Sequence, residues 1–247
     1  MVKGVILAGG LGTRLECLTK ITNKHLLPVY DKPMIYYPLC TLVEAGIKDI
    51  MIVTGGNHAG EFLRLLGNGK ELGLKEIHYT YQTGEAGIAD ALRLAEDFAD
   101  GNKIVVILGD NLFETSIKEY VDKFERQSKG ARVLLKKVKD PERFGVVEFK
   151  KGKVVSIEEK PKHPKSKYAV TGIYMYDHEV FKYISKLKKS HRGEYEITDI
   201  NNMYLQNETL SYDIVKGFWT DCGAFESLLK ANMLIAAKKG INLEKLL

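Results

Sequence analysis

The sequence has few cysteines, and they form none of the patterns that bind metals or build disulfide frameworks. Its three cysteines, Cys17, Cys40 and Cys222, are odd in number and far apart, and none belongs to a C-x-x-C pair. Neither a disulfide framework nor a zinc site is therefore expected. A reducing compartment, the cytoplasm, is the simplest location.

Long apolar runs are also missing. No segment reaches the roughly 18 apolar residues that a membrane-spanning helix needs. The apolar run near the N-terminus, VILAGG, is shorter than the apolar region of a secretion signal. We therefore expect no membrane span, no signal peptide and no membrane partner.

Charge of one sign is not concentrated anywhere in the chain. The net charge is +5, but the lysines and arginines are spread along the sequence instead of forming a basic arm. A weak positive surplus suits an anionic small substrate and does not require nucleic acid. With 45% hydrophobic and 28% charged residues, the 247-residue composition is typical of one globular domain with one large core.

Over the first 140 residues, apolar runs alternate with segments of helical periodicity. The apolar runs, expected as strands, are 3–9, 49–55, 77–82 and 103–110. The periodic segments, expected as helices, are 34–46, 58–67, 87–101 and 117–130. Continuous apolar strands that alternate with helices predict a parallel sheet whose two faces are covered by helices.

From residue 131 onward, strands joined by short turns replace this alternation. The expected strands are 131–138, 144–161 with a Lys151-Gly152 turn inside it, and 168–177. They predict an antiparallel addition to the same sheet. The expected elements that follow are a helix near 177–187, a helix from about Ile197, a strand over 210–217 and a closing helix over 223–239.

Together these segments predict an α/β fold. It is a Rossmann-like mixed, mainly parallel sheet with helices on both faces and an antiparallel addition. No repeat, low-complexity tract or linker interrupts the chain. We expect a single domain over residues 1–247, with the α/β core in 1–140 and the antiparallel part and closing helix in 141–247.

A glycine-rich turn follows the first expected strand, in VILAGGLGTRL at residues 5–15. A P-loop needs G-x-x-x-x-G-K-[ST], which is not present, and a dinucleotide fingerprint needs a small residue where this chain has Leu15. A third interpretation is an anion cradle of backbone N–H groups, to which Arg14 and Lys24 add cations. The turn could equally be a structural strand-to-helix connection, and Lys24 a surface lysine.

Three charged residues elsewhere are candidates for the same site. Asp110 ends an apolar strand, so it lies at a carboxyl end of the sheet, where open α/β folds bind ligands. Asp221 in FWTDCG is, by itself, as well explained as a turn residue or a helix N-cap. Arg192 lies in a lysine-rich loop, where a solvated charge run is the simpler explanation.

The combination of short motifs resembles a known family. GGLGTRL, NKHLLPV, KPMIYYPL, LGDN, FGVVEF, EEKP, YAVTGIYMYD, RGEYEITD and WTDCG occur in the order and spacing of the sugar-phosphate nucleotidylyltransferases. The resemblance runs from residue 3 to about residue 230 and is greatest to the short form of the glucose-1-phosphate thymidylyltransferases. It implies direct in-line attack of a sugar 1-phosphate on a nucleoside triphosphate, with release of pyrophosphate. Such a transfer needs charge neutralisation and alignment more than a nucleophilic side chain. The sequence agrees, because it shows no Ser-His or Cys-His pairing.

The resemblance also assigns roles to individual residues on the nucleotide side. It implies that Asp110 and Asp221 hold one Mg²⁺. The implied catalytic residues are Arg14, Lys24, Asp110, Lys160, Arg192 and Asp221. The implied nucleotide-binding residues are Leu7, Gly9, Gly10, Gly12, Thr13, Arg14, Lys24, Gln82, Gly87 and Asp110.

A second set is implied for the sugar phosphate. Its members carry amide, carboxylate, cationic or backbone groups that suit hydroxyls and a phosphate, with one aromatic wall. They are Asn111, Gly145, Glu159, Lys160, Val170, Gly172, Arg192 and Trp219. Glu158 is expected on the opposite face of its strand and in a different role.

We therefore expect an enzyme that joins dTTP to glucose 1-phosphate, giving dTDP-glucose and pyrophosphate, and that forms a homo-oligomer. UTP is the alternative nucleotide, because the chain has Thr83 and GIADA where longer members of the family have proline and GLAQA. The alternative function is a non-catalytic nucleotide-sugar-binding regulatory protein, which would be expected to lose one of the implied catalytic residues. A glycosyltransferase would offer a D-x-D pair where this chain has GDN.

Overall fold

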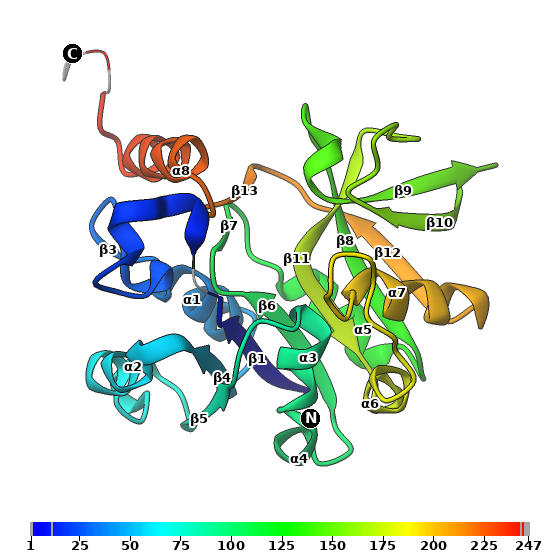
Figure 1. Ribbon diagram of the computed structural model, residues 1–247, viewed down its shortest axis with the longest axis horizontal. Helices are drawn as coiled ribbons and strands as arrows, with labels where there is room; N and C mark the ends of the chain where they lie inside the picture. Colours follow the sequence, from blue (N-terminus) through cyan, green and yellow to red (C-terminus); the bar gives the residue numbers. More distant parts are fainter. Residues whose placement is uncertain (1, 11, 243, 245–247) are drawn as a thin grey trace.

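Apolar β-branched runs build the centre of the molecule. The computed structural model describes residues 2–10, 12–242 and 244. Four parallel strands, in the spatial order β6-β1-β4-β5, form one half of a nine-stranded sheet (Figure 1). They are β1 (Val2–Ala8), β4 (Asp49–Gly55), β5 (Glu76–Gln82) and β6 (Lys103–Leu108). The predicted parallel core is therefore confirmed.

The second half of the sheet is largely antiparallel. β11 (Tyr168–Tyr176) joins the two halves because it pairs antiparallel with β6 on one side and with β8 (Ala131–Lys137) on the other. β9 (Gly145–Lys150) and β10 (Lys153–Glu159) form the predicted hairpin beyond it. β12 (Leu210–Ile214) adds to β8 in parallel.

One face of the sheet is covered by α1 (Tyr36–Glu44), α2 (Ala59–Leu66) and α5 (Lys118–Arg126). Alternate strand residues point to this face, among them Ile6 and Ile52, which are fully buried. A parallel strand is buried on both faces, so both sets of its alternating side chains must be apolar. This explains why the strands are continuous apolar runs in the sequence.

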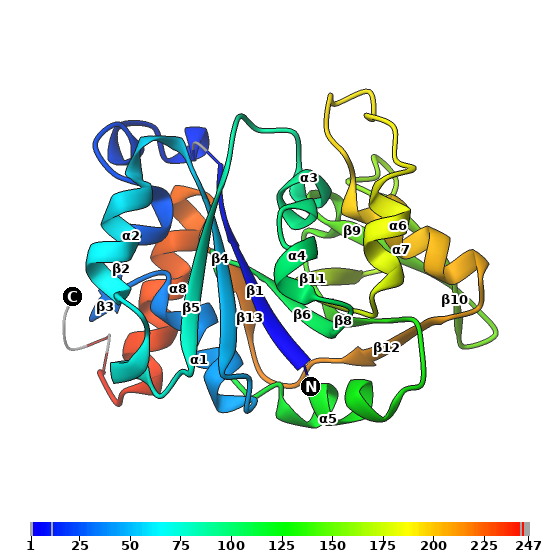
Figure 2. The same cartoon turned by 90° about the horizontal axis from the view of Figure 1, so that it is seen from below.

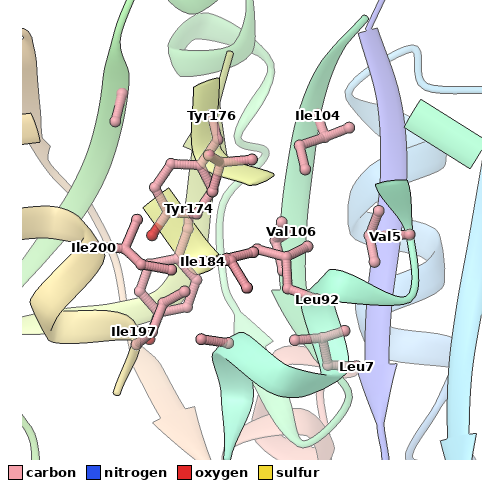
Figure 3. Close-up of a cluster of buried hydrophobic side chains, with 14 of the residues drawn as sticks. Val5, Leu7, Leu92, Ile104, Val106, Tyr174, Tyr176, Ile184, Ile197 and Ile200 are labelled. Atoms are coloured by element: carbon pink, nitrogen blue, oxygen red, sulfur yellow. The ribbon is translucent and has the colours of Figure 1, made fainter. Parts of the chain in front are cut away.

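The opposite face carries a larger core under α3 (Ile88–Arg93), α4 (Glu96–Ala99), α6 (Glu179–Ile184) and α7 (Ile197–Gln206). Figure 2 shows these four helices on the other side of the strands from α1 and α2. Figure 3 shows residues from β1, β6 and β11 packed against α3, α6 and α7. The shared core ties the parallel and antiparallel halves together. Its labelled members are Val5, Leu7, Leu92, Ile104, Val106, Tyr174, Tyr176, Ile184, Ile197 and Ile200.

The segment 87–101 differs from the sequence expectation. It was predicted as one helix, but it forms α3 and α4 with a break at Leu94 and Ala95. Both residues donate their backbone N–H groups three residues back, to Ala91 and Leu92. Such tighter bonds are typical where a helix ends, and no proline or internal glycine in the sequence announces this break.

Short elements complete the fold. The closing helix α8 (Phe225–Lys238) is as predicted and packs on a third apolar cluster. Two small ribbons pair β2 (Pro28–Val29) with β3 (Lys32–Pro33) and β7 (Asn111–Phe113) with β13 (Trp219–Asp221). The 3₁₀ turns are η1 (Thr13–Thr19), η2 (Lys24–Leu26), η3 (Gly56–His58), η4 (Lys70–Leu72) and η5 (Pro141–Arg143). Within the described residues, no helix has the length and apolar character to cross a membrane.

Candidate active site

Two adjoining cavities lie at the carboxyl ends of the parallel strands. The first, here called the glycine-turn cavity, has a volume of about 690 Å³ and is bounded by the turn after β1, by the end of β5 and by α3. The second, here called the hairpin cavity, has a volume of about 190 Å³ and lies between the β9–β10 hairpin, β11 and α7. The cavities share charged lining residues, namely Arg14, Asp110, Lys160, Arg192 and Glu194.

The glycine turn is shaped by close approach of its neighbours. A Cβ atom at Gly9 would lie 2.9 Å from Gln82 Oε1, and one at Gly12 would lie 2.9 Å from Thr19 Cγ2. Gly10 and Gly12 also have φ angles of 90° and 64°, which favour glycine. The turn therefore brings bare backbone to the cavity wall, as an anion cradle requires.

Arg14 extends from this turn toward the second cavity. Its side chain is exposed and takes part in no ion pair or hydrogen bond among the residues that the structure describes. A Cβ atom at Gly223 would lie 2.6 Å from one guanidinium nitrogen of Arg14 and 3.1 Å from Asp221 Oδ2. Glycine at this position therefore lets the guanidinium approach the Asp221 carboxylate.

Asp110 follows β6 and lies at the boundary of the two cavities. Lys24 Nζ donates to its Oδ2 at 2.7 Å, and Asn111 Nδ2 donates to its Oδ1 at 2.8 Å. Burial alone would raise the pKa of Asp110, but the charge of Lys24, the neighbouring His25 and these two hydrogen bonds hold it below its usual range. Asp110 is therefore a carboxylate at neutral pH.

His25 is buried beside the ion pair between Lys24 and Asp110. Its Nδ1 lies 2.7 Å from Asn23 Oδ1, which also accepts the His25 backbone N–H at 3.0 Å. Burial, and then the charge of Lys24, lowers the pKa of His25 to about 3. A Cβ atom at Gly109 would lie 2.7 Å from His25 Cδ2, so the strand end and the imidazole fit closely. His25 is neutral near pH 7.

Asp221 reaches Asp110 from a distant part of the chain. The β7–β13 ribbon places Asp221 opposite Asn111, and the Cys222 backbone N–H donates to the Asp110 carbonyl at 2.9 Å. Arg143 Nη2 donates to both oxygens of Asp221, at 3.0 and 3.1 Å. Asp140 pairs with the other end of the same guanidinium at 2.7 Å.

The two aspartates fit the needs of a hard divalent cation. Mg²⁺ uses one or two protein carboxylates and completes its octahedral shell with water and substrate phosphate oxygens. Asp110 and Asp221 both line the hairpin cavity and are tied together by the ribbon. The described residues contain no group of three histidine, cysteine or acidic side chains that could hold a metal. Asp110 and Asp221 thus fit an ion that takes two protein carboxylates and completes its shell with water and substrate oxygens.

The hairpin cavity holds a dense network of charge around Arg192. The Arg192 guanidinium contacts Glu194 at 2.8 Å, Glu196 at 3.2 Å and Glu159 at 3.8 Å. Thr198 Oγ1 donates to Glu159 Oε2 at 2.6 Å. Burial, and next the negative charge of Glu196, raises the pKa of Glu159, although the Thr198 hydrogen bond opposes the shift.

Asn111 lies in this cavity, but its amide is occupied by protein groups. Its Oδ1 accepts from the Gly172 backbone N–H at 3.1 Å and from Trp219 Nε1 at 2.6 Å. Its Nδ2 donates to Asp110. A Cβ atom at Gly172 would lie 2.5 Å from the Asn111 side-chain carbon, so this strand position requires glycine. Asn111 therefore positions its neighbours in addition to lining the cavity.

The structure brings the residues predicted from the sequence into these two cavities. Lining the glycine-turn cavity are Leu7, Gly9, Gly10, Gly12, Thr13, Arg14, Lys24, Gln82, Gly87 and Asp110. Lining the hairpin cavity are Asn111, Gly145, Glu159, Lys160, Val170, Gly172, Arg192, Trp219 and Asp221. Glu158 is exposed, on the opposite face from Glu159.

Several lining or supporting residues were not predicted from the sequence. Arg143 immediately precedes FGVVEF and Thr198 lies within RGEYEITD, but single polar residues in such positions carry no periodic signal. Asn201 lies on the helical face that Ile197 begins, and its buried Nδ2 has no partner among the described residues. Asn201 lines the hairpin cavity, and its unpaired amide would be satisfied by a hydroxyl.

Comparison with known proteins gives a family match. A model of the family described as nucleotidyl transferase matches residues 3–238. The chain is 46% identical over 244 residues to the glucose-1-phosphate thymidylyltransferase of Neisseria meningitidis, across 97% of this chain and 84% of that protein. It is also 46% identical over 235 residues to the enzyme of the same name from Mycolicibacterium smegmatis, across 94% and 81%.

Solved structures agree with the fold. A Bacillus anthracis protein described as a glucose-1-phosphate thymidylyltransferase, in complex with sucrose, is similar with a TM-score of 0.90 and 54% identity over 95% of each chain. UDP-glucose pyrophosphorylase in complex with UDP-glucose is similar with a TM-score of 0.83 at 23% identity, over 96% of this chain and 100% of that one. At that identity the second likeness concerns the fold alone.

Proposed function

This chain belongs to the nucleotidyl transferase family, and from that premise we propose that it joins dTTP to glucose 1-phosphate, giving dTDP-glucose and pyrophosphate. The chain is an enzyme that resembles glucose-1-phosphate thymidylyltransferases, and the family acts on a nucleoside triphosphate and a sugar phosphate. One observation carries the proposal. Two cavities meet at a wall where three cations, Arg14, Lys160 and Arg192, outnumber the acids Asp110 and Glu194, so two anionic reactants could be held together there.

The triphosphate is proposed to lie in the glycine-turn cavity. Backbone N–H groups of the turn would cradle its phosphates, and Arg14, which has no internal partner among the described residues, would bind them through its guanidinium. Lys24 would stabilise charge on the transferred phosphorus, because its ammonium is held in place by Asp110 at 2.7 Å. Preplaced cations of this kind act without reorganisation during the reaction.

The sugar phosphate is proposed to lie in the hairpin cavity. Lys160 and Arg192 would bind its phosphate, and Glu159, the orphan Asn201 amide and the backbone of Val170 and Gly172 would meet its hydroxyls. Val170 and Gly172 line the cavity where the partner of β11 on one edge changes from β9 to β6. Trp219, packed on Phe144 at 5.0 Å between ring centroids, would form the wall against the ring.

The reaction is proposed as direct in-line attack of the sugar-phosphate oxygen on the α-phosphorus, with pyrophosphate as the leaving group. Such a step depends on alignment and charge neutralisation more than on a nucleophilic side chain. Enzymes of this family generally depend on a divalent metal ion, and we propose Mg²⁺ held by Asp110 and Asp221. When bound it would supply charge neutralisation at the phosphate oxygens. Arg143 holds Asp221 ready for that role.

The substrate assay tests the proposal. Purified protein with Mg²⁺ and glucose 1-phosphate should release pyrophosphate faster with dTTP than with UTP, and only when the sugar phosphate is present. Arg14→Ala should reduce the rate strongly, whereas Arg126→Ala, an exposed change at the end of α5, should not. Binding of a nucleotide sugar without pyrophosphate release from any triphosphate would favour the regulatory alternative.

Three wider features belong to the same proposal. The chain is proposed to act as one domain in which residues 1–140 bind the nucleotide and 141–247 the sugar phosphate, supported by one sheet that runs through both parts. The cytoplasm is proposed as its location, since its three cysteines are free. A homo-oligomer is proposed because α8 exposes Phe225, Leu229 and Met233 along one side.

A further inference from the structure

We infer that Asp90 is a positioning residue that sets the base selected by the glycine-turn cavity. By holding the Gln82 amide NH₂, it turns the Gln82 carbonyl oxygen toward the bound base. The cavity then accepts a pyrimidine with an N–H at ring position 3, thymine or uracil, and rejects cytosine. The inference rests on the proposed function for the identity of the ligand as a nucleoside triphosphate.

The geometry of Gln82 is fixed on three sides. Gln82 ends β5 and is buried. Its Nε2 donates to Asp90 Oδ2 at 2.9 Å and to the Gly87 carbonyl at 3.4 Å. Its Oε1 lies toward the glycine turn, 2.9 Å from where a Cβ atom of Gly9 would stand. Gln82, Gly9 and Gly87 all line the glycine-turn cavity.

Asp90 decides which way the amide points. The oxygen and nitrogen of a glutamine amide have nearly the same shape, so the surrounding donors and acceptors determine its orientation. An ionised aspartate offers acceptors only, and so does the Gly87 carbonyl. A reversed amide would bring the Gln82 oxygen against two other oxygens and leave its NH₂ toward Gly9. The carboxylate therefore excludes the reversed state.

Asp90 is itself held in place by Arg93, and it lies outside the lining of both cavities. It lies in the first turn of α3, and its Oδ1 accepts from Arg93 Nη2 at 3.0 Å, which leaves Oδ2 for Gln82. Its side chain is 13% exposed, and it is not among the residues that line either cavity in the described chain. Asp90 thus acts on the ligand only through Gln82.

The oriented amide distinguishes pyrimidines by hydrogen-bond chemistry. Thymine and uracil carry a hydrogen at N3 and can donate it to Gln82 Oε1. Cytosine has an unprotonated N3, which would place two acceptors against each other in a buried site and leave both unpaired. Thymine and uracil present the same edge, so Asp90 does not choose between them.

The test compares Asp90→Asn with Asp97→Asn. Both replace an aspartate by its isosteric amide and remove one negative charge, but Asp97 is exposed on α4 and contacts neither Gln82 nor the cavities. An asparagine at position 90 can donate to Gln82 as well as accept from it, so the Gln82 amide becomes free to reverse. The preference for dTTP over CTP should fall about tenfold in Asp90→Asn, the effect of one misplaced hydrogen bond, and stay unchanged in Asp97→Asn.

Two readouts are measured for each variant. The first is the ratio of kcat/KM for dTTP and CTP with glucose 1-phosphate and Mg²⁺. The second is the ratio of the affinities for dTTP and CTP by calorimetry, without sugar phosphate. Asp90→Ala is a second variant, which removes the partner altogether and should move both ratios in the same direction. Arg93→Ala retains the Asp90 carboxylate and should retain the preference for dTTP.

The outcomes separate this inference from the proposed function. If the wild type releases no pyrophosphate with any sugar phosphate, but Asp90→Asn still lowers the preference in binding, the proposed function fails and the role of Asp90 stands. If wild-type turnover is as proposed, but both ratios of Asp90→Asn and Asp90→Ala match those of Asp97→Asn, the role of Asp90 is overturned.

Discussion

The two cavities meet at one wall but treat charge in opposite ways. At the glycine turn, bare backbone and Arg14, which has no partner among the described residues, face the open space, and Lys24 pairs with Asp110 beside them. In the hairpin cavity, Arg192 is surrounded by three carboxylates, and the nearby Arg143 by two. The glycine turn thus offers an anion N–H donors that are unpaired within the described chain, whereas Arg192 and Arg143 are already paired with protein carboxylates.

This difference teaches how each side would bind a phosphate. An anion that enters the glycine-turn cavity meets N–H groups and a guanidinium without first breaking an internal pair, so binding adds favourable contacts directly. A phosphate that approaches Arg192 competes with Glu194 and Glu196 for the same N–H donors. Part of its attraction is thus lost to the exchange, but the freed carboxylates become acceptors for hydroxyls. Such an exchange favours a ligand that carries both a phosphate and hydroxyl groups.

The largest expected effect is at the shared wall. Asp110→Asn should lower kcat by about a thousandfold, because it removes a proposed metal ligand and the charge that holds Lys24 in place. The thermal transition should change little by comparison. Steady-state pyrophosphate release and a thermal melt of the same preparation measure the two quantities.

The matched control for this change is Asp97→Asn, the same isosteric change at an exposed aspartate on α4 that lines neither cavity. It should leave most of the activity. If instead Asp110→Asn lowers the melting temperature strongly, Asp110 is a structural residue and the two cavities do not meet at a catalytic wall.

The second prediction compares how titratable groups on the two sides of the site change the unfolding free energy with pH. The folded protein keeps His25 neutral down to about pH 3, while the unfolded chain binds a proton below about 6.5. The unfolded state therefore binds more protons between these values, and stability falls as the pH falls below 6.5. From pH 7 to pH 5 this group should cost about 2 kcal/mol of unfolding free energy. On the hairpin side, the raised pKa of Glu159 acts in the opposite direction, since acid favours its folded form.

Urea unfolding at the two pH values, followed by the fluorescence of the single tryptophan, measures this loss. His25→Gln, which cannot take up a proton in this range, should lose less stability than the wild type by that amount. Equal losses in both proteins would mean that protonation of His25 is not the cause of the loss of stability in acid.

The smallest expected effect is that of a change at Glu194, and its outcome could contradict the contrast drawn between the two cavities. Glu194→Gln removes one of the three carboxylates around Arg192, so glucose 1-phosphate should bind about threefold more tightly, the scale of one partly exposed ion pair. Calorimetric titration with glucose 1-phosphate measures this, with Glu125→Gln on the exposed side of α5 as control. Weaker binding in Glu194→Gln would show that this carboxylate contributes directly to the ligand instead of competing with it.

Sequence patterns predicted the parts of the molecule that depend on periodicity. The parallel core, the Lys151-Gly152 hairpin and the closing helix follow from apolar spacing and turn residues. The break between α3 and α4 could not be predicted, because it depends on how Leu92 and Phe98 both reach the core instead of on any helix-breaking residue.

Some residues of the candidate site could likewise be predicted from the sequence, and others could not. Motifs identified Asp110 and Asp221, and the structure brings both to one cavity. The roles of Arg143 and Asp90 could not be identified, since each acts through another side chain and no sequence pattern reveals such a contact, although Asp90 lies within GIADA. Pairwise contacts of this kind exist only once the tertiary structure is formed.

The β7–β13 ribbon has a consequence for the protein while it is still being made. It joins Asn111 to Asp221 across more than a hundred residues of chain, so a ribosome must extend the chain past residue 221 before the second acid can take its place. A product that stops short of β13 carries the glycine turn and Asp110 but only half of the acid pair. The proposed metal pair therefore arises only after both halves of the sheet have been synthesised.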